Sequence, residues 1–237
     1  MLSGFMPGLT SLITLHDAVL LIDSASSRVQ VGLCGHDRSA VWHQSEQEPS
    51  VALFECVAAS LTEAGMGMHD IGAFVFCEGP GSILGIRTAA MALRTWQAVG
   101  QPAPPAYAYR SLELAAHALR ENGTRPPFAV IADARRNAWH WVEVAIDGTI
   151  GPLQRAPSSA LADFTGDLFM PVGFRTWTSL PRKVHAVPYS LPSWWQRHSE
   201  TDLLHSAPEP DAFLHEDSTY ASWTPQIHRA PTSRART

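Results

Sequence analysis

Short apolar runs separated by polar turns open the folded part of the chain and predict three strands. Residues 18–24 form an apolar run with β-branched side chains that ends in small polar residues, which is typical of a buried strand. Residues 29–33 alternate between apolar and polar positions, and residues 39–43 follow a turn at Gly35–Arg38. Because the connections are short, these segments predict an antiparallel meander.

Longer segments with helical spacing follow the meander. In residues 49–64 apolar side chains return every three or four positions, and Gly65 stands where a helix would stop. Ser45 and Glu48 fit a capping box at the start of this helix. The other predicted elements are a strand at 73–77, helices at 83–99 and 111–120, and strands at 128–133 and 138–146.

The order of these elements predicts an α/β fold of two lobes, each with a mixed sheet and helices. After Pro157 the periodicity weakens, and many of the 18 Pro and 8 Trp residues lie in that part. We expect four regions, namely a disordered N-terminal extension at 1–17, an N-terminal lobe at 18–122, a smaller, divergent C-terminal lobe at 123–227 and a tail at 228–237.

Composition and charge narrow the class of protein. The hydrophobic share of 45% and the charged share of 16% are those of a globular protein. With 17 Lys and Arg against 22 Asp and Glu, the chain lacks the basic excess of a protein that grips nucleic acid unaided. No run of about 18 apolar residues predicts a membrane span, and residues 1–17 lack the basic start of a signal peptide.

The three cysteines, Cys34, Cys56 and Cys77, are far apart and never form a C-x-x-C pair, so neither a disulfide framework nor a zinc site is predicted. We expect them to be buried apolar residues. Together with the missing signal peptide, they favour a cytoplasmic location.

A glycine-rich turn between a predicted strand and a predicted helix, Gly79–Arg87, is the most distinctive segment. Such turns hold phosphate groups in many proteins. Here the third glycine is one position late for the G-x-G-x-x-G fingerprint, and neither the spacing nor the lysine of a P-loop is present. The alternative is a structural turn, in which Gly79 and Gly81 bend the chain, Ser82 caps the helix and Gly85 permits close packing.

The same segment, G-P-G-S at 79–82 followed by G-I-R at 85–87, resembles the G-P-G-S-F-T-G-x-R signature of the TsaB (YeaZ) family. The sequence departs from that pattern at Ile83–Leu84, at Thr88–Ala89 and at Gln44, where His is common. Other segments agree with the family in order and spacing, namely Leu21–Ala25, Gln44–Glu46, Ser111–Glu113 and Asp133–Arg136.

The resemblance implies an actin/Hsp70/sugar-kinase-like fold and a non-catalytic role. Members of the TsaB family pair with TsaD, a homologue that retains the catalytic site, and with the ATPase TsaE. TsaD transfers a threonylcarbamoyl group to the adenosine beside the anticodon of tRNAs that read codons starting with A. By resemblance, this chain reaches tRNA only through such a complex.

The residues support the absence of catalysis. The catalytic homologue binds a metal through H-x-x-x-H, whereas none of the 11 histidines here stands four residues from another. Asp23 lies where nucleotide-binding relatives have a metal-linked carboxylate, but no suitable Lys or Thr follows it. It is interpreted as a carboxylate that closes a strand and accepts turn N–H groups. We therefore expect no catalytic residue, no metal site and no cofactor.

Two further sets of residues are candidates for binding. In similar proteins the helices at 49–64 and 83–99 pack against the partner, although one face of each also has to cover its own sheet. The expected partner interface is Val51, Phe54, Val57, Ala58, Ile83, Arg87, Ala90 and Met91. The cluster of Asp133, Arg135 and Arg136 is either a hairpin with a local ion pair or a contact to nucleotide or tRNA in the assembly.

Two other classes of function remain open. One is an enzyme of the same fold, either kinase-like or metallopeptidase-like, against which the failed phosphate loops and the absent H-x-x-x-H argue. The other is an interaction module with no link to tRNA, which the departures at Ile83–Leu84 allow.

Overall fold

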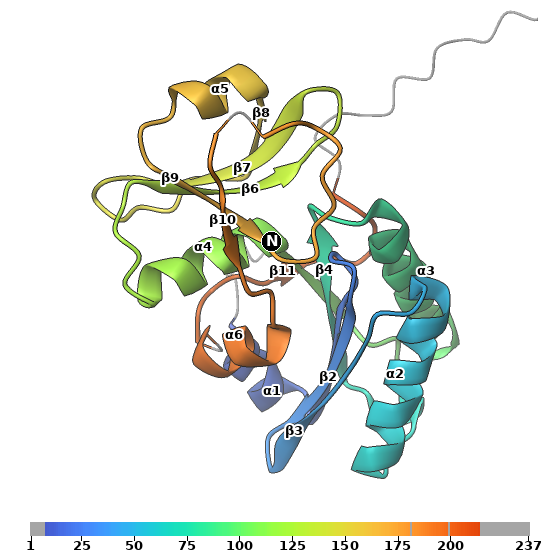
Figure 1. Cartoon of the computed structure of the whole chain (residues 1–237). Helices are drawn as coiled ribbons and strands as arrows, with labels where there is room; N and C mark the ends of the chain where they lie inside the picture. The colour runs from blue at the N-terminus through green and yellow to red at the C-terminus, as the bar shows by residue number, and fades with distance from the viewer. Residues whose placement is uncertain (1–7, 181, 199, 214–237) are drawn as a thin grey trace, which may run out of the picture.

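The computed structural model describes residues 8–213 except 181 and 199. It contains two mixed β-sheets with helices packed on their faces (Figure 1). The first sheet has six strands in the order β11-β5-β4-β1-β2-β3. Their bounds are β1 (Ala18–Asp23), β2 (Val29–Gly35), β3 (Arg38–Ser45), β4 (Ala73–Gly79), β5 (Ala106–Arg110) and β11 (His205–Ser206).

The second sheet has five strands in the order β10-β9-β6-β7-β8. Their bounds are β6 (Phe128–Asp133), β7 (Ala138–Val144), β8 (Gln154–Pro157), β9 (Asp167–Pro171) and β10 (His185–Val187). The helices are α1 (Leu9–Leu15), α2 (Pro49–Ala64), α3 (Ile83–Val99), α4 (Ser111–Glu121), α5 (Ser158–Asp163) and α6 (Leu191–His198), with a short 3-10 helix at Met68–Asp70.

The two sheets repeat one pairing pattern around their first strands. β1 pairs antiparallel with β2 and parallel with β4, and β6 pairs antiparallel with β7 and parallel with β9. Each first strand ends in an aspartate, Asp23 in β1 and Asp133 in β6, immediately before a turn. Both turns border one cleft between the lobes.

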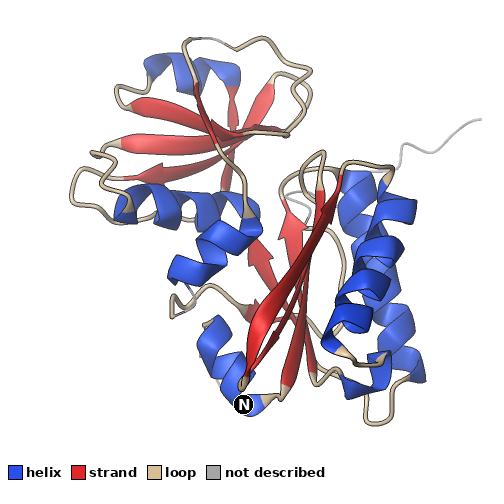
Figure 2. Ribbon diagram, turned by 60° about the horizontal axis from the view of Figure 1, so that its bottom comes forward, coloured by secondary structure: helices blue, strands red, loops and turns tan. Residues whose placement is uncertain are grey.

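The helices complete five layers (Figure 2). α2 and α3 cover the outer face of the first sheet, where Leu20, Ile22, Phe74 and Phe76 point into their shared core. α4, with α1 and α6, lies between the sheets in a core to which both contribute, and α5 packs on the outer face of the second sheet. Because both faces are covered, every residue of β1 is buried.

The N-terminal extension differs from the prediction. Residues 9–15 form helix α1, and Leu9 and Leu12 are buried in the core between the sheets. The expectation of disorder is therefore wrong for residues 8–17, because a short amphipathic segment gains order by burying two leucines against the core. Residues 1–7 and the predicted tail at 228–237 lie outside the described residues.

Two other predicted boundaries also change. β11 comes from the last third of the chain but pairs antiparallel with β5 of the first sheet, so the N-terminal lobe is not limited to residues 18–122. The Trp-rich last third also contributes to the central core, because Trp194 and Trp195 of α6 are buried there.

All three cysteines are buried and free, as predicted, and burial raises the pKa of the Cys34 thiol to about 12. Among the residues that the structure describes, no helix combines the length and apolarity needed to cross a membrane.

Candidate functional site

A cleft of about 680 Å³ lies between the two lobes. Its first wall comes from the β1–β2 turn, the start of α2 and the start of α3. Its second wall comes from the β6–β7 turn, from β8 and from the loop after β9. The charged and aromatic residues that line it are Glu46, Glu48, Glu78, Asp133, Arg135, Arg136, His140, Arg155, Phe174, Arg175, Trp177 and Phe213.

The glycine-rich turn of the first wall is shaped by close packing. Gly79 has a φ of 122°, which a residue with a side chain rarely adopts. A Cβ on Gly81 would lie 2.3 Å from the carbonyl oxygen of Ala25, and a Cβ on Gly85 would lie 2.3 Å from that of Ser24. The glycines thus let the start of α3 press against the β1–β2 turn.

Two backbone N–H groups of this turn, those of Ser82 and Gly85, already have partners within the protein. The Ser82 N–H donates to the Ala25 carbonyl at 2.7 Å, and the Gly85 N–H donates to the Ser82 hydroxyl at 3.3 Å. The Ser111 hydroxyl donates to the Pro80 carbonyl at 2.6 Å. The β1–β2 turn therefore takes one of the N–H groups that a phosphate group would use at this helix N-terminus.

Asp23, at the end of β1, is completely buried and fully hydrogen-bonded. The hydroxyls of Tyr109 and Tyr189 each donate to Oδ2 at 2.5 Å, and the Ala25 N–H donates to Oδ1 at 2.9 Å. Burial raises the pKa of Asp23, against the opposing effect of these hydrogen bonds. Its role is the structural one inferred from the sequence, with two tyrosines added by the fold.

Asp133, at the end of β6, is partly exposed and accepts mainly backbone N–H groups. Oδ1 accepts the Arg135 N–H at 2.6 Å, and Oδ2 accepts those of Trp177 and Thr178 at 2.6 and 2.7 Å. Partial burial raises the pKa of Asp133, but these hydrogen bonds outweigh it and hold that pKa below the ordinary value. Asp133 is an anchor for two loops.

The β6–β7 turn has an unusual backbone. Arg135, Arg136 and Asn137 have φ values of 61°, 53° and 56°, a left-handed run that residues with side chains seldom adopt. The guanidinium of Arg135 lies 4.5 Å from the ring centroid of Trp177. Of the two readings left open by the sequence, a local ion pair is wrong, because Asp133 is bonded to backbone N–H groups and to the Thr178 hydroxyl and not to the guanidinium of Arg135 or Arg136.

The fold gathers more residues at this turn than the sequence analysis identified. Arg155 on β8, and Arg175 and Trp177 in the loop after β9, line the same wall as Arg135 and Arg136. These residues lie in the weakly periodic last part of the chain, where no sequence signal pointed to them. Only the pairing of β7 with β8 and of β6 with β9 brings them together.

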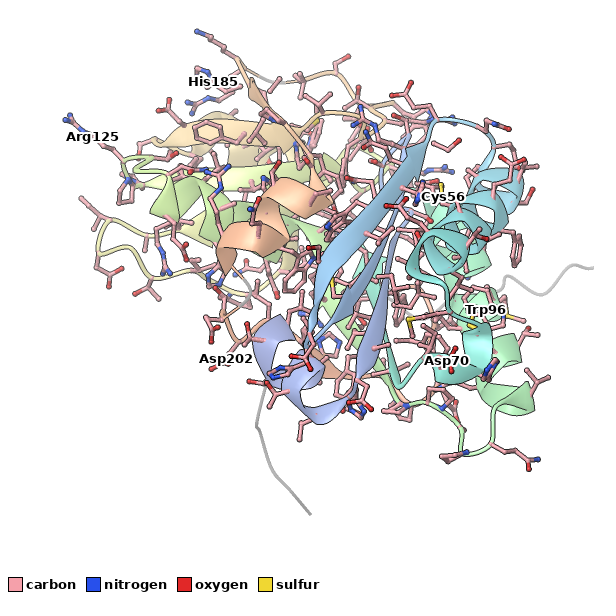
Figure 3. The ribbon with its side chains drawn as sticks, turned by 90° about the horizontal axis from the view of Figure 1, so that it is seen from below. Cys56, Asp70, Trp96, Arg125, His185 and Asp202 are labelled. Atoms are coloured by element: carbon pink, nitrogen blue, oxygen red, sulfur yellow. The ribbon has the colours of Figure 1, made fainter. Side chains whose placement is uncertain are left out.

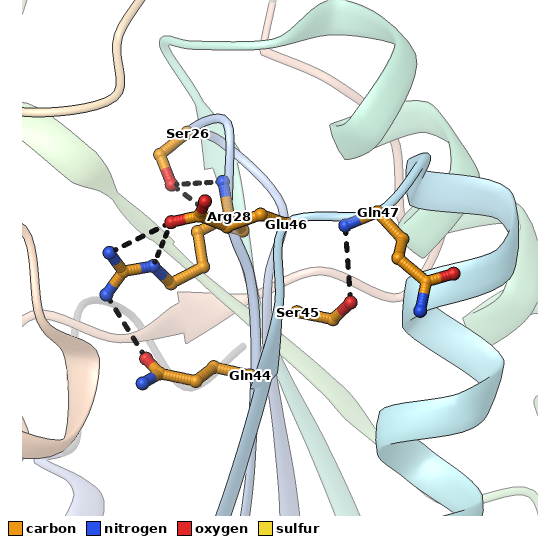
Figure 4. Close-up of polar contacts among 6 residues, drawn as sticks. All are labelled: Ser26, Arg28, Gln44, Ser45, Glu46 and Gln47. Carbon is orange, nitrogen blue, oxygen red and sulfur yellow. Dashed lines mark hydrogen bonds and ion pairs between the residues drawn. The ribbon is translucent and has the colours of Figure 1, made fainter.

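The carboxylates of the opposite wall have partners of their own. Arg28 contacts Glu46 at 3.2 Å and Gln44 at 3.3 Å (Figure 4). Glu78 lies 3.0 Å from Arg110 and 3.2 Å from His205. Burial raises the pKa of Glu78, but these two partners outweigh it and leave that pKa lowered.

The predicted capping box at the start of α2 is incorrect. Ser45 ends β3, and its hydroxyl accepts the Gln47 N–H at 3.2 Å (Figure 4). The cap is Glu48, whose carboxylate accepts the Ser50 N–H at 3.1 Å. The extended β3 continues to Ser45, so the helix cannot begin there.

The expected partner interface divides into exposed and buried residues. Val57 and Ala90 are 4% and 2% exposed and belong to the core beneath α2 and α3, so the expectation that they contact a partner is incorrect. Leu84, which is not among the expected interface residues, is 63% exposed. The exposed set is Val51, Phe54, Ala58, Ile83, Leu84, Arg87 and Met91.

The described residues contain no group of three or more His, Cys, Asp or Glu side chains arranged to hold a metal ion. The polar groups at both strand ends of the cleft are engaged in holding loops together. The arrangement suits binding on the arginine-rich wall better than proton transfer.

Comparison with known proteins identifies the family. The model of the family described as "TsaD: tRNA N6-adenosine threonylcarbamoyltransferase" matches residues 43–165, which is more than half of the chain. No curated protein matches the sequence.

Solved structures identify the fold. YeaZ from Pseudomonas aeruginosa is 24% identical over 84% of this chain and 100% of its own, with a TM-score of 0.58. A second structure, of a protein with similarity to peptidase YeaZ from Pseudomonas aeruginosa, is 23% identical over 79% of this chain and 97% of its own, with a TM-score of 0.55. The predicted α/β fold of two mixed sheets with helices is confirmed, and the YeaZ structures share it. The chain belongs to the TsaD family, and its fold is that of YeaZ, as its resemblance to the TsaB (YeaZ) sequences predicted.

Proposed function

We propose that this protein is a non-catalytic subunit that pairs with a TsaD-type transferase and, with a TsaE-type ATPase, supports threonylcarbamoylation of the adenosine beside the anticodon in tRNAs that read codons starting with A. The family and the YeaZ fold support a role in this modification. The feature of this chain that carries the proposal is an apolar surface on α2 and α3.

That surface, the α2/α3 patch, consists of large side chains exposed on two packed helices. They are exposed by 44% at Val51, 49% at Phe54, 41% at Ile83, 63% at Leu84 and 57% at Met91. Several large apolar side chains exposed on two neighbouring helices commonly mark a protein interface. The helices bury their other faces on the first sheet, so the patch is free to meet the equivalent helices of a homologue.

The polar groups at the end of β1 are hydrogen-bonded within the protein, and this supports a non-catalytic role. In a kinase-like enzyme the turn after β1 and the carboxylate before it would meet phosphate groups and metal. Here the turn contacts the start of α3 through Ala25, and Asp23 binds two tyrosine hydroxyls. Freeing either group would require breaking buried hydrogen bonds.

Pairing is tested by charged substitutions in the α2/α3 patch. Phe54→Asp and Met91→Asp should each weaken binding of a TsaD homologue by about 2 kcal/mol or more, which is about thirty-fold in Kd, because a carboxylate would be desolvated at the interface. Ile146→Asp is the matched control, since Ile146 is 81% exposed but lies in the second lobe. Circular dichroism checks that the variants fold. Undiminished pairing of both variants would rule out the patch as the interface.

The role in tRNA modification has its own test. Depletion of the protein should reduce threonylcarbamoyladenosine in tRNA, measured by mass spectrometry of digested nucleosides. Re-expression of the Ile146→Asp variant should restore the modified nucleoside, whereas Phe54→Asp should not. An unchanged level after depletion would favour an interaction module with no link to tRNA.

A further inference from the structure

The second wall of the cleft concentrates positive charge and an exposed aromatic ring. Arg135, Arg136 and Arg175 are exposed, Arg155 is half-buried, and Trp177 is 59% exposed. The protein as a whole is acidic, with a formal charge of -5, so this local excess is not a consequence of composition.

The carboxylate of Asp133 holds the two loops of this wall together. Asp133 accepts N–H groups from Arg135 in one loop and from Trp177 and Thr178 in the other, and thereby ties the two loops together. The left-handed backbone from Arg135 to Asn137 is a strained arrangement that such bonds have to maintain. Strain of this kind concentrates at binding sites, where it fixes side chains before the ligand arrives.

Three of the four arginines on this wall are not paired with carboxylates of the described residues. Among the described residues, no carboxylate lies within ion-pair distance of Arg135, Arg136 or Arg175. Across the cleft, Glu46 is paired with Arg28, and Glu78 with Arg110 and His205. An anion entering the cleft therefore meets three arginines, Arg135, Arg136 and Arg175, that have no carboxylate partner among the described residues.

We propose that this arginine wall binds a nucleotide segment of an RNA strand, with phosphates on the arginines and a base stacked on the open face of Trp177. Arg135 covers one face of the indole, so a base on the other face would complete a stack. The inference rests on the proposed function and deepens it, because it gives this subunit its own contact with the tRNA.

The geometry favours an RNA strand over a free nucleoside triphosphate. A compact triphosphate would use amides at the start of α3 and a carboxylate for its metal, but the Ser82 and Gly85 N–H groups and the Asp23 carboxylate are engaged within the protein. The arginines come from three separate segments, the β6–β7 turn, β8 and the loop after β9. Arginines distributed over three segments can contact successive phosphates along an RNA strand.

The test measures binding of a fluorescently labelled single-stranded RNA of about ten nucleotides to the full-length chain by anisotropy, at several salt concentrations. Arg135→Ala and Arg175→Ala should each weaken binding about three- to ten-fold and reduce the slope of log K against log salt by about 0.7. Trp177→Ala should weaken binding about ten-fold with an unchanged slope, and Trp177→Phe should retain most of the affinity.

Arg125→Ala is the matched control, because Arg125 is an exposed arginine of the same lobe that does not line the cleft (Figure 3). Equal weakening by Arg125→Ala and Arg135→Ala, or unchanged binding by Trp177→Ala, would overturn the inference. Displacement of the RNA by an equimolar amount of ATP would also overturn it and assign the wall to a free nucleotide. Because pairing with a TsaD homologue is measured separately, loss of the RNA contact alone leaves the proposed function standing.

Discussion

Asp23 and Asp133 occupy matching positions in the two lobes, but Asp23 is buried and Asp133 is partly exposed at the cleft. Each ends the first strand of its sheet, and each accepts the N–H of the residue two positions later, Ala25 or Arg135. Asp23 is buried and its remaining bonds come from two tyrosine hydroxyls, whereas Asp133 is partly exposed and receives two more backbone N–H groups. The pKa of Asp23 is raised and that of Asp133 is lowered.

The comparison shows how one motif acquires two roles. In the first lobe the start of α3 packs on the turn after the aspartate through Ala25, and Tyr189 from the last third of the chain binds the aspartate itself. In the second lobe the turn stays at the cleft surface and presents Arg135 and Arg136. The first aspartate is therefore a buried structural group, whereas the second holds a turn that presents two arginines to the cleft.

The largest effect is expected at Asp23. Asp23→Ala should lower the free energy of unfolding by about 3 to 5 kcal/mol, because it leaves two buried tyrosine hydroxyls and the Ala25 N–H without an acceptor. Denaturant titration measures the change. Asp202→Ala is the control, since Asp202 is exposed (Figure 3) and should change stability by less than about 0.5 kcal/mol. Similar losses at the two sites would mean that the tyrosine pair does not stabilise the fold.

A smaller effect is expected where α3 presses on the turn after Asp23. Gly81→Ala should lower the free energy of unfolding by about 1 to 3 kcal/mol, because the new Cβ would lie 2.3 Å from the Ala25 carbonyl oxygen, a backbone atom that cannot move alone. Gly151→Ala is the control, since its Cβ would meet only the Glu143 carbonyl oxygen at 3.4 Å. Thermal unfolding of both variants measures the difference, and equal midpoints would contradict the close packing.

The smallest effect is on pH dependence, and its sign differs between the two aspartates. Asp23 has a folded-state pKa above its ordinary value of 3.8, so its contribution to stability is present below that value and is lost as pH rises through the folded pKa. Asp133 has a folded-state pKa below 3.8, so its contribution is present above that value and is lost as pH falls through the folded pKa.

Each group contributes a slope of at most about 1.4 kcal/mol per pH unit. Asp23→Asn should therefore flatten a fall in stability above pH 4, and Asp133→Asn should flatten a fall below pH 4. Urea titrations at a series of pH values measure both slopes. The same sign of change in both variants would show that the two surroundings are not opposite.

Local patterns predicted most of the first lobe. The helix bounds at 49–64 and 83–99 agree with α2 and α3, and the strands at 18–24, 73–77 and 128–133 lie within two residues of β1, β4 and β6. Apolar periodicity is set by which face of an element is covered, so it is visible along the chain. Helix α6 lies in the part of the chain after Pro157, where we expected no defined element, and it is held by Trp194 and Trp195 in a core shared by distant segments.

The same logic explains the errors at the candidate interface. Helical spacing shows that α2 and α3 have apolar residues on more than one face, but it does not show which face meets the sheet. Val57 and Ala90 face the sheet and Leu84 faces outward, which depends on how each helix is rotated on β-strands far away in sequence. Rotation is a property of packing and not of the helix alone.

The sequence by itself determined the family, the two-lobed α/β architecture and the structural character of the glycine turn, because these depend on residue identities at fixed short spacings. Only the tertiary structure decided that Tyr189 closes over Asp23, 166 positions away, and that Arg155, Arg175 and Trp177 join Arg135 on one wall. Contacts between distant segments depend on how the sheets stack and pair, and no local spacing encodes them.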